Sequence, residues 1–77
     1  MSEADRLFEE LGYKKFISED CVMYMKDLFQ ITFIFQNKSF INEYKQGDYN
    51  FPKIKPFELS MEELKAINKK CEELGWI

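Results

Sequence analysis

The chain has 77 residues, with 14 acidic and 11 basic side chains, a net charge of −3 and no histidine. This length corresponds to one domain, which we place at residues 1–77. The acidic balance argues against a dedicated duplex-DNA binder, and without histidine the commonest general acid–base group is missing.

The first predicted helix covers residues 3–11, with Ser2 as its N-cap. Its apolar face repeats at helical spacing. That face comprises Ala4, Leu7, Phe8 and Leu11. Gly12 ends the helix, because a residue without a Cβ adopts the left-handed conformation at little cost. The aromatic side chain that follows, Tyr13, should fold back over Phe8.

The middle of the chain has the pattern of strands. Residues 13–17 and 21–26 are two predicted strands, separated by the polar segment 18–20. The clearest strand is 29–36, in which apolar and polar residues alternate with a period of two. Its core-facing side comprises Phe29, Ile31, Phe33 and Phe35.

A two-residue hairpin loop, Asn37-Lys38, is predicted to follow, because asparagine tolerates positive φ. This loop sets a register in which Phe35 faces Phe40 on the core side. The same register places Asn42 on the core side. A shift by one residue, which would exchange the two faces of the strand, is therefore an alternative.

Two prolines interrupt the segment 49–56, where they exclude a helix and remove backbone donors. We expect this segment to be an edge strand or an ordered surface loop. The second predicted helix begins after Ser60, which forms a capping box with Glu63, and it ends at Gly75. Its expected buried stripe is Leu64, Ile67, Cys71 and Leu74, with Met61 at its start. Its expected solvent side comprises Glu62, Lys65, Lys69, Lys70 and Glu73.

These elements predict an α+β fold, an antiparallel β-sheet of three to five strands with N-terminal and C-terminal helices packed on one face. The first fifteen residues are charged and the apolar runs are short, so we expect a cytoplasmic protein without a membrane segment. Cys21 and Cys71 are then expected as reduced thiols, with a disulfide between them as the alternative.

The sequence predicts no enzyme, no cofactor and no metal site. Two cysteines without histidine do not make a zinc site. Only three glycines are present, and two of them end helices, so a phosphate-binding loop is not expected. Adjacent carboxylates such as Glu72 and Glu73 point about 100° apart on a helix and do not converge on one substrate.

The predicted function is protein binding, with a homodimer as one form of it. Aromatic residues make up 17% of the chain, a surplus that favours an exposed apolar patch. The hairpin register pairs two isoleucines on the outer face of the sheet, and aromatic side chains often dominate interfaces. The candidate partner-binding residues are therefore Ile34, Ile41, Tyr49, Phe51 and Trp76.

Two other functions are kept as alternatives. A single-stranded nucleic-acid binder would use lysines next to aromatic residues, with Lys45, Lys53 and Lys55 as its contacts. The acidic ends of the chain argue against nucleic acid. A pocket between sheet and helices could instead sequester a small ligand, such as a nucleotide signal.

Three segments resemble a group of small proteins encoded by phages and prophages of Gram-positive bacteria. They are Leu7–Tyr13, Ile31–Phe33 and Met61–Trp76, the last of which ends in Glu-Leu-Gly-Trp. The resemblance implies a short first helix, an antiparallel sheet and a terminal helix. It also implies a phage accessory protein that binds a host or phage protein, in some cases as an inhibitor of host defence. It carries over no functional residues.

Overall fold

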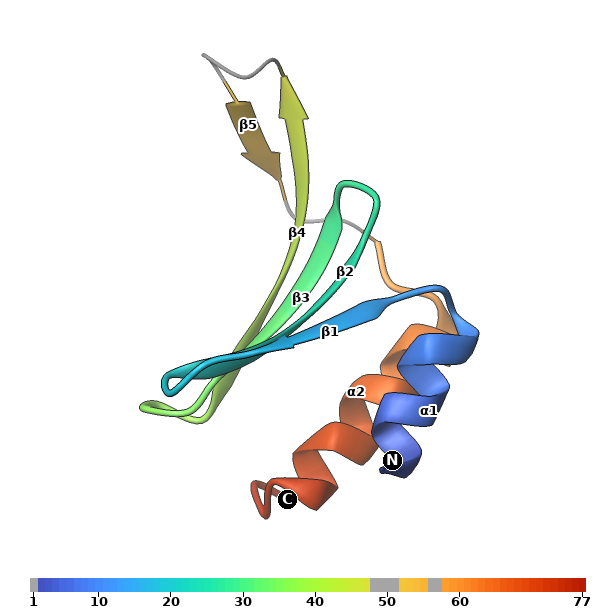
Figure 1. Cartoon of the computed structure of the whole chain (residues 1–77), viewed down its shortest axis with the longest axis vertical. Coiled ribbons are helices and arrows are strands. Elements are labelled where there is room, and N and C mark those ends of the chain that lie inside the picture. The colour runs from blue at the N-terminus through green and yellow to red at the C-terminus, as the bar shows by residue number, and fades with distance from the viewer. Residues whose placement is uncertain (1, 48–51, 56–57) are drawn as a thin grey trace.

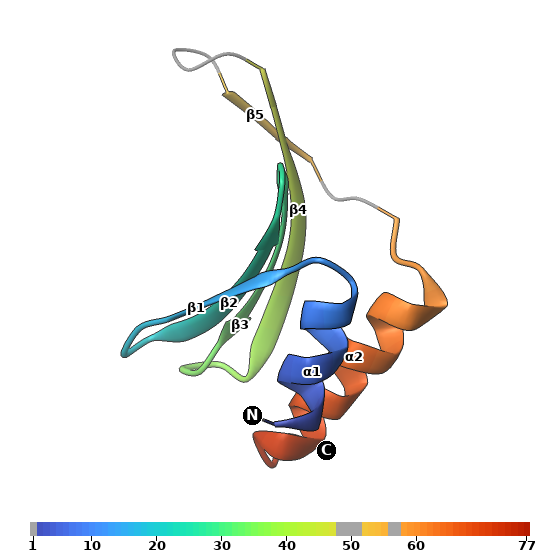
Figure 2. The same ribbon diagram turned by 45° about the vertical axis from the view of Figure 1, so that its right-hand side comes forward.

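The computed structural model describes residues 2–47, 52–55 and 58–77, with side chains for 2–44 and 58–77. The elements are α1 (Glu3–Glu10), β1 (Lys14–Ile17), β2 (Cys21–Lys26), β3 (Phe29–Ile34), β4 (Ser39–Gly47), β5 (Pro52–Lys55) and α2 (Met61–Glu73). The strands form one antiparallel sheet in the order β1-β2-β3-β4-β5. Both helices lie side by side against one face of it (Figures 1 and 2). The predicted α+β fold is confirmed.

Both helices begin and end as the sequence predicts. The Ser2 hydroxyl accepts a hydrogen bond from the Asp5 backbone N–H at 3.0 Å. Gly12 has φ +95°, and the Tyr13 N–H donates to the Phe8 carbonyl at 2.9 Å. The two rings of that pair meet edge to face at 5.6 Å. The chain reversal after α1 is therefore fixed by backbone and side chain together.

The ending of α2 repeats this geometry. Gly75 has φ +76°, and the Trp76 N–H donates to the Cys71 carbonyl at 2.9 Å. At the start of α2, Ser60 and Glu63 form the capping box in both directions, at 3.1 and 2.9 Å. The indole of Trp76 then lies 6.2 Å from the ring of Phe33, so the end of the helix contributes to the core.

The β3–β4 hairpin has the predicted faces but a different register. Phe33 pairs with Phe40, where the prediction had placed Phe35 opposite Phe40. The loop therefore spans four residues, 35–38, and Lys38 has the left-handed conformation, with φ +53°. The pairing is shifted by two residues, which keeps every side chain on its expected face because the side-chain period is two.

The shifted register changes which outer residues are neighbours. Ile41 lies opposite Thr32, and Ile34 lies opposite Ser39, so the predicted pairing of the two isoleucines was wrong. Asn42 does lie on the core-side face, opposite Ile31. The alternative of a one-residue shift, which would have exchanged the faces, is excluded.

The core lies between the helices and the face of the sheet that they cover. The ring of Phe8 stacks on Tyr24, with 3.9 Å between centroids, and meets Phe33 edge to face at 6.3 Å. The other buried apolar residues are Ala4, Tyr13, Val22, Ile31, Ala66, Ile67 and Cys71. An aromatic trio from α1, β2 and β3 is therefore the centre of the domain.

Helix α2 turns a different stripe toward the core from the one expected. Its buried residues are Glu63, Ala66, Ile67, Lys70 and Cys71. Met61 and Leu64 are 63% and 46% exposed, while Lys70, expected in solvent, is 8% exposed. The helix is rotated because two of its polar side chains have buried hydrogen-bonding or charged partners beneath it. The spacing of apolar residues along the helix does not reveal these partners, because they lie on other elements.

The sheet ends in two short edge strands. All four residues of β1 are exposed. The proline-containing segment forms the other edge, where Pro52 pairs with Gly47 at the end of β4. The expectation of an edge strand therefore holds for Pro52–Lys55. In the part of the chain that the structure describes, neither helix is long and apolar enough to cross a membrane.

Candidate functional site

A partly buried polar cluster joins both helices to the sheet. The Tyr24 hydroxyl donates to Asp5 Oδ1 at 2.6 Å, and Lys15 Nζ lies 2.8 Å from Asp5 Oδ2. Lys70 Nζ approaches Asp5 Oδ1 to 3.7 Å from α2. One carboxylate of α1 is thus shared by β1, β2 and α2.

The ionisation states in this cluster support one another. Burial alone would raise the pKa of Asp5, but the hydrogen bonds from Lys15 and Tyr24 and the charge of Lys70 lower it to about 2. Burial and the hydrogen bond to Asp5 raise the pKa of Tyr24 far above its usual range. At neutral pH the carboxylate of Asp5 is therefore charged and the phenol of Tyr24 is protonated, and the two groups are hydrogen-bonded to each other. The cluster is a structural joint that ties α1 to the sheet and to α2.

A second joint lies beside it. The Tyr13 hydroxyl donates to Glu63 Oε2, and Lys26 Nζ lies 4.9 Å above the Tyr13 ring. Burial works against ionisation of Glu63, yet the hydrogen bonds from Tyr13 and Ser60 lower its pKa. These contacts explain why Glu63, the second member of the capping box of α2, points toward the core.

A shallow groove of about 440 Å³ runs between α1 and β1. It is lined by Asp5, Glu9, Tyr13, Lys14, Lys15 and Tyr24. Most of its polar groups already pair within the two joints, so a small ligand would compete with contacts that hold the fold. This groove is the nearest feature to the pocket that the small-ligand alternative requires.

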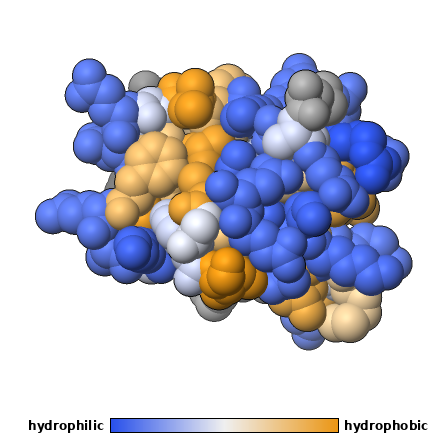
Figure 3. Space-filling view, turned by 90° about the horizontal axis from the view of Figure 1, so that it is seen from below, coloured by the Kyte–Doolittle hydropathy of each residue, from blue (hydrophilic) through white to orange (hydrophobic). Residues whose placement is uncertain are grey.

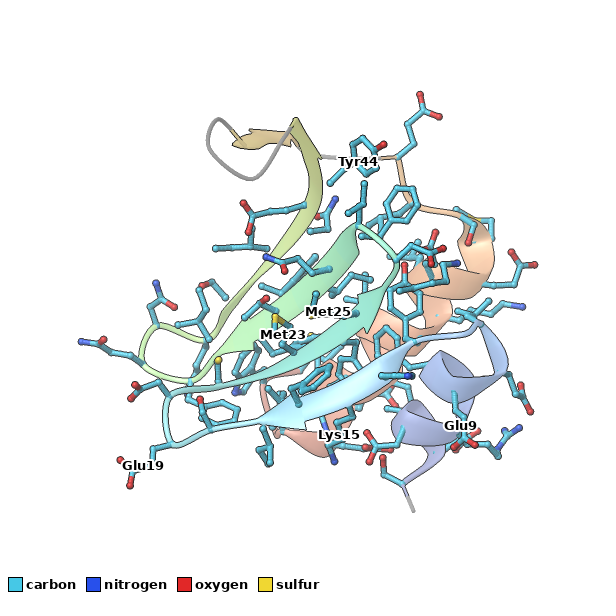
Figure 4. The ribbon with its side chains drawn as sticks, turned by 45° about the horizontal axis from the view of Figure 1, so that its top comes forward. Glu9, Lys15, Glu19, Met23, Met25 and Tyr44 are labelled. Atoms are coloured by element: carbon cyan, nitrogen blue, oxygen red, sulfur yellow. The ribbon has the colours of Figure 1, made fainter. Side chains whose placement is uncertain are left out.

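The opposite face of the sheet, which neither helix covers, has a largely apolar row across four strands. The row consists of the successive register partners Phe16, Met23, Thr32 and Ile41. Side chains of such partners lie about 5 Å apart on one face, so the row is continuous. Phe16 and Ile41, at its two ends, are 51% and 43% exposed. Figure 4 shows Met23 and Met25 next to each other on the sheet.

Two rows flank this one. One consists of the register partners Lys14, Met25, Gln30 and Glu43. The other consists of Cys21, Ile34 and Ser39. We call the three rows together the open face. Lys15, the next residue of β1, reaches Asp5 on the side that the helices cover, so the alternation of the strand places Lys14 on the open face. A positive charge thus lies at the β1 edge of the open face and a negative charge, Glu43, at its β4 edge.

The open face contains two of the partner-binding residues expected from the sequence. Ile34 and Ile41 lie there on neighbouring strands. Trp76 lies on the other side of the sheet, packed against the aromatic core, and is not part of this surface. Tyr49 and Phe51 lie outside the described residues.

Sequence reasoning missed Phe16, Met23 and Met25 as members of the open face. The available signal was in residues 21–25, which are all apolar. A strand with one solvated face should alternate, so an unbroken apolar run indicates that both faces are apolar.

The lysines expected to contact nucleic acid are placed only by their backbone. Lys45 pairs with Ile54, and Lys55 pairs with Tyr44, at the β4–β5 edge. Tyr44 itself packs on the ring of Phe29 at 5.0 Å, so this aromatic side chain is engaged within the protein.

Another apolar area lies at the end of the molecule that is seen from below in Figure 3. Its exposed residues include Ile17 and Phe40, the two ends of a core-side row whose middle members, Val22 and Phe33, are buried. This area is therefore the fringe of the core and not a separate surface.

Comparison of the chain with family models, curated proteins and solved structures gives no match. Among the described residues, no group of acidic or cysteine side chains is arranged to hold a metal ion.

Proposed function

We propose that this chain is a protein-binding module whose contact surface is the open face. The observation that carries the proposal is the row of Phe16, Met23, Thr32 and Ile41, which crosses four strands with no element of the described chain packed on it. Contiguous apolar surface of this kind marks interaction sites in proteins. Covering it contributes about 25 cal/mol per Å² of apolar surface removed from water.

The chemistry of the open face suits a protein better than a small ligand. Backbone groups within a sheet bond to neighbouring strands, so a partner can exclude water from the inner strands without leaving buried donors or acceptors unpaired. Met23 and Met25 are unbranched and polarisable side chains that adapt to the shape of a partner. A twisted sheet of this kind offers a broad surface, whereas small ligands bind in concave sites.

The resemblance of both chain ends to phage-encoded proteins supports an accessory role in an infected host cell. In that setting the partner is a protein of the phage or of the host cytoplasm, and inhibition of a host defence protein is one form of this role. The module acts by occupying a surface and performs no chemical step of its own.

Two adjacent residues of β1 provide a matched test. Phe16 lies on the open face and Ile17 on the core-side fringe, and they are 51% and 72% exposed. Phe16→Glu should reduce the amount of partner protein that the immobilised chain retains by about tenfold or more, because a charge would be desolvated in the interface. Ile17→Glu should retain the wild-type amount.

Met23→Glu, in the middle of the same row, should repeat the loss. Circular dichroism and thermal melting would show that each variant is folded. Equal retention by wild type, Phe16→Glu and Met23→Glu would refute the open face as a binding surface.

A further inference from the structure

We infer that the protein bound by the open face is a second copy of this chain. The two copies are related by a two-fold axis that runs along the strands, between β2 and β3. This inference rests on the proposed function and names its partner. It is argued from the positions of charges around the apolar row.

The charged ends of one row are complementary under this axis. Lys14 lies at the β1 edge and Glu43 at the β4 edge of the row that they share. A two-fold axis along the strands exchanges β1 with β4 and β2 with β3. Lys14 of each copy then faces Glu43 of the other, and the interface contains this pair twice. Aligned sheets pack about 10 Å apart with strands crossing at about 30°, a gap that a lysine side chain can span.

The apolar row is complementary to itself under the same axis. Phe16 of one copy lies over Ile41 of the other, and Met23 lies over Thr32. The apolar row, which runs beside the row that ends in the two charges, is therefore covered from end to end. Thr32 is the row's only hydroxyl residue, and it meets a methionine that can adapt to it.

The turns at the far end of the strands are complementary as well. Glu19 and Asp20 lie in the β1–β2 turn, and Lys38 lies in the β3–β4 turn. Both turns are at the same end of the sheet (Figure 1), and Figure 4 shows Glu19 at the tip of its turn. The axis places the acidic turn of one copy near the Lys38 turn of the other.

A two-fold axis across the strands pairs different charges. It exchanges the two ends of every strand and brings Lys14 near the acidic residues of the β1–β2 turn and Glu43 near Lys38 of the β3–β4 turn. Each of those pairs has one member in a turn, whereas the axis along the strands pairs residues within the sheet. Only the axis along the strands brings Lys14 and Glu43 together, so exchanging their charges distinguishes the two arrangements.

The size of the open face sets the strength of the dimer. Four strands about 4.8 Å apart and six residues of about 3.4 Å give a face of roughly 19 by 20 Å. This projection, roughly 400 Å² per copy, is smaller than the roughly 800 Å² per partner of a standard interface. An interface of this size falls in the range of weak and transient contacts, so we expect a weak dimer.

Reciprocal charge reversal tests the arrangement. Lys14→Glu and Glu43→Lys each create two like-charge contacts in their own dimer, so each variant alone should raise the Kd by about tenfold or more in sedimentation velocity. An equimolar mixture of the two variants restores both opposite-charge contacts and should form a heterodimer with wild-type affinity. Lys65→Glu, on an exposed surface of α2, is the control and should dimerise normally.

The outcomes separate this inference from the proposed function. Restoration by mixing supports the dimer and its axis. A wild-type dimer that ignores both reversals overturns the axis. If the wild type is a monomer at millimolar concentration and still binds another protein through Phe16, the inferred homodimer is overturned and the proposed function stands. If the wild type is a monomer and its binding to another protein is unchanged by Phe16→Glu, both the homodimer and the proposed function are overturned.

Discussion

Asp5 shows how much of this fold depends on one side chain. Its carboxylate accepts from Tyr24 and Lys15 and lies 3.7 Å from Lys70, so it links α1 to two strands and to α2. Tyr24 is 1% exposed, and its hydroxyl would have no solvent to replace a lost partner. A buried donor left unpaired costs about 1–3 kcal/mol.

The stability of the protein should fall in acid through Asp5. Its pKa is 3.8 when unperturbed and about 2 in the fold. Because the charged carboxylate is favoured in the fold, its interactions contribute their full stabilisation above pH 3.8. This contribution is lost as the pH falls toward 2 and the carboxylate is protonated. The free energy of unfolding should fall by about 2 kcal/mol when this carboxylate is fully protonated.

Urea unfolding at pH 5 and at pH 2.5 would measure this effect. Asp5→Asn should be less stable than wild type at pH 5 and should show a smaller further loss at pH 2.5, because the titrating group is absent. An equal loss in both proteins would show that another carboxylate carries the acid sensitivity.

Gly75 is the second residue at which a single change should be informative. Its φ of +76° is unfavourable for a side chain, although a Cβ added there meets nothing within 4 Å. Gly75→Ala should therefore lower the free energy of unfolding by about 1 kcal/mol through backbone strain alone. Gly75→Asn should cost less, since asparagine tolerates this conformation. Chemical denaturation compares the two, and equal costs would argue against a conformational origin.

At the level of elements, the β3–β4 hairpin separates local from tertiary information. The alternation of residues 29–36 predicted a strand and its faces, and both are confirmed at Phe29–Ile34. The loop was predicted two residues too short, because Asn-Lys resembles a tight turn. In the fold, the Phe35 N–H donates to the Asp20 carbonyl at 3.0 Å and its ring packs against the core, so β3 ends before residue 35 and the chain turns earlier than local preference suggests.

The longer loop predicts a stabilising substitution. Lys38 has φ +53° and is one of two described non-glycine residues with positive φ. Lys38→Gly should raise the free energy of unfolding by roughly 0.5–1 kcal/mol, as relief of strain exceeds the entropy that glycine adds. Asn37→Gly should not stabilise, because Asn37 does not have positive φ and its side chain accepts from Ser39 at 2.6 Å. Stabilisation by both changes in thermal melting would instead indicate the two-residue loop.

Helix α2 illustrates the limit of periodicity. The cap at Ser60 and the stop at Gly75 were read correctly, because they depend on residues next to them in the chain. The buried stripe was misread at Leu64 and Lys70. The rotation of the helix is set by the Tyr13–Glu63 hydrogen bond and by Lys70 approaching Asp5. Tyr13 is 50 positions away from Glu63 in the chain, and Asp5 is still farther from Lys70.

In the part of the chain that the structure describes, both helices cover the same side of the sheet, and this asymmetry should be visible in bulk measurements. If a second copy covers the open face, unfolding is linked to dissociation. The melting temperature should then rise with protein concentration between about 10 µM and 1 mM. Phe16→Glu should remove this dependence, whereas Ile17→Glu should preserve it. A wild-type melting temperature that is constant across this range would contradict self-association.

The sequence by itself determined the features that depend on neighbouring residues: the two glycine-stopped helices, the capping box, the Phe-rich strand and its two faces. These follow from backbone preferences and side-chain periods, which act over a few positions. Only the tertiary structure decided which surface is left open. That choice depends on which face of the sheet the helices cover, and the helices are fixed there by contacts such as Phe8 on Tyr24 and Asp5 with Lys70, between residues far apart in the chain.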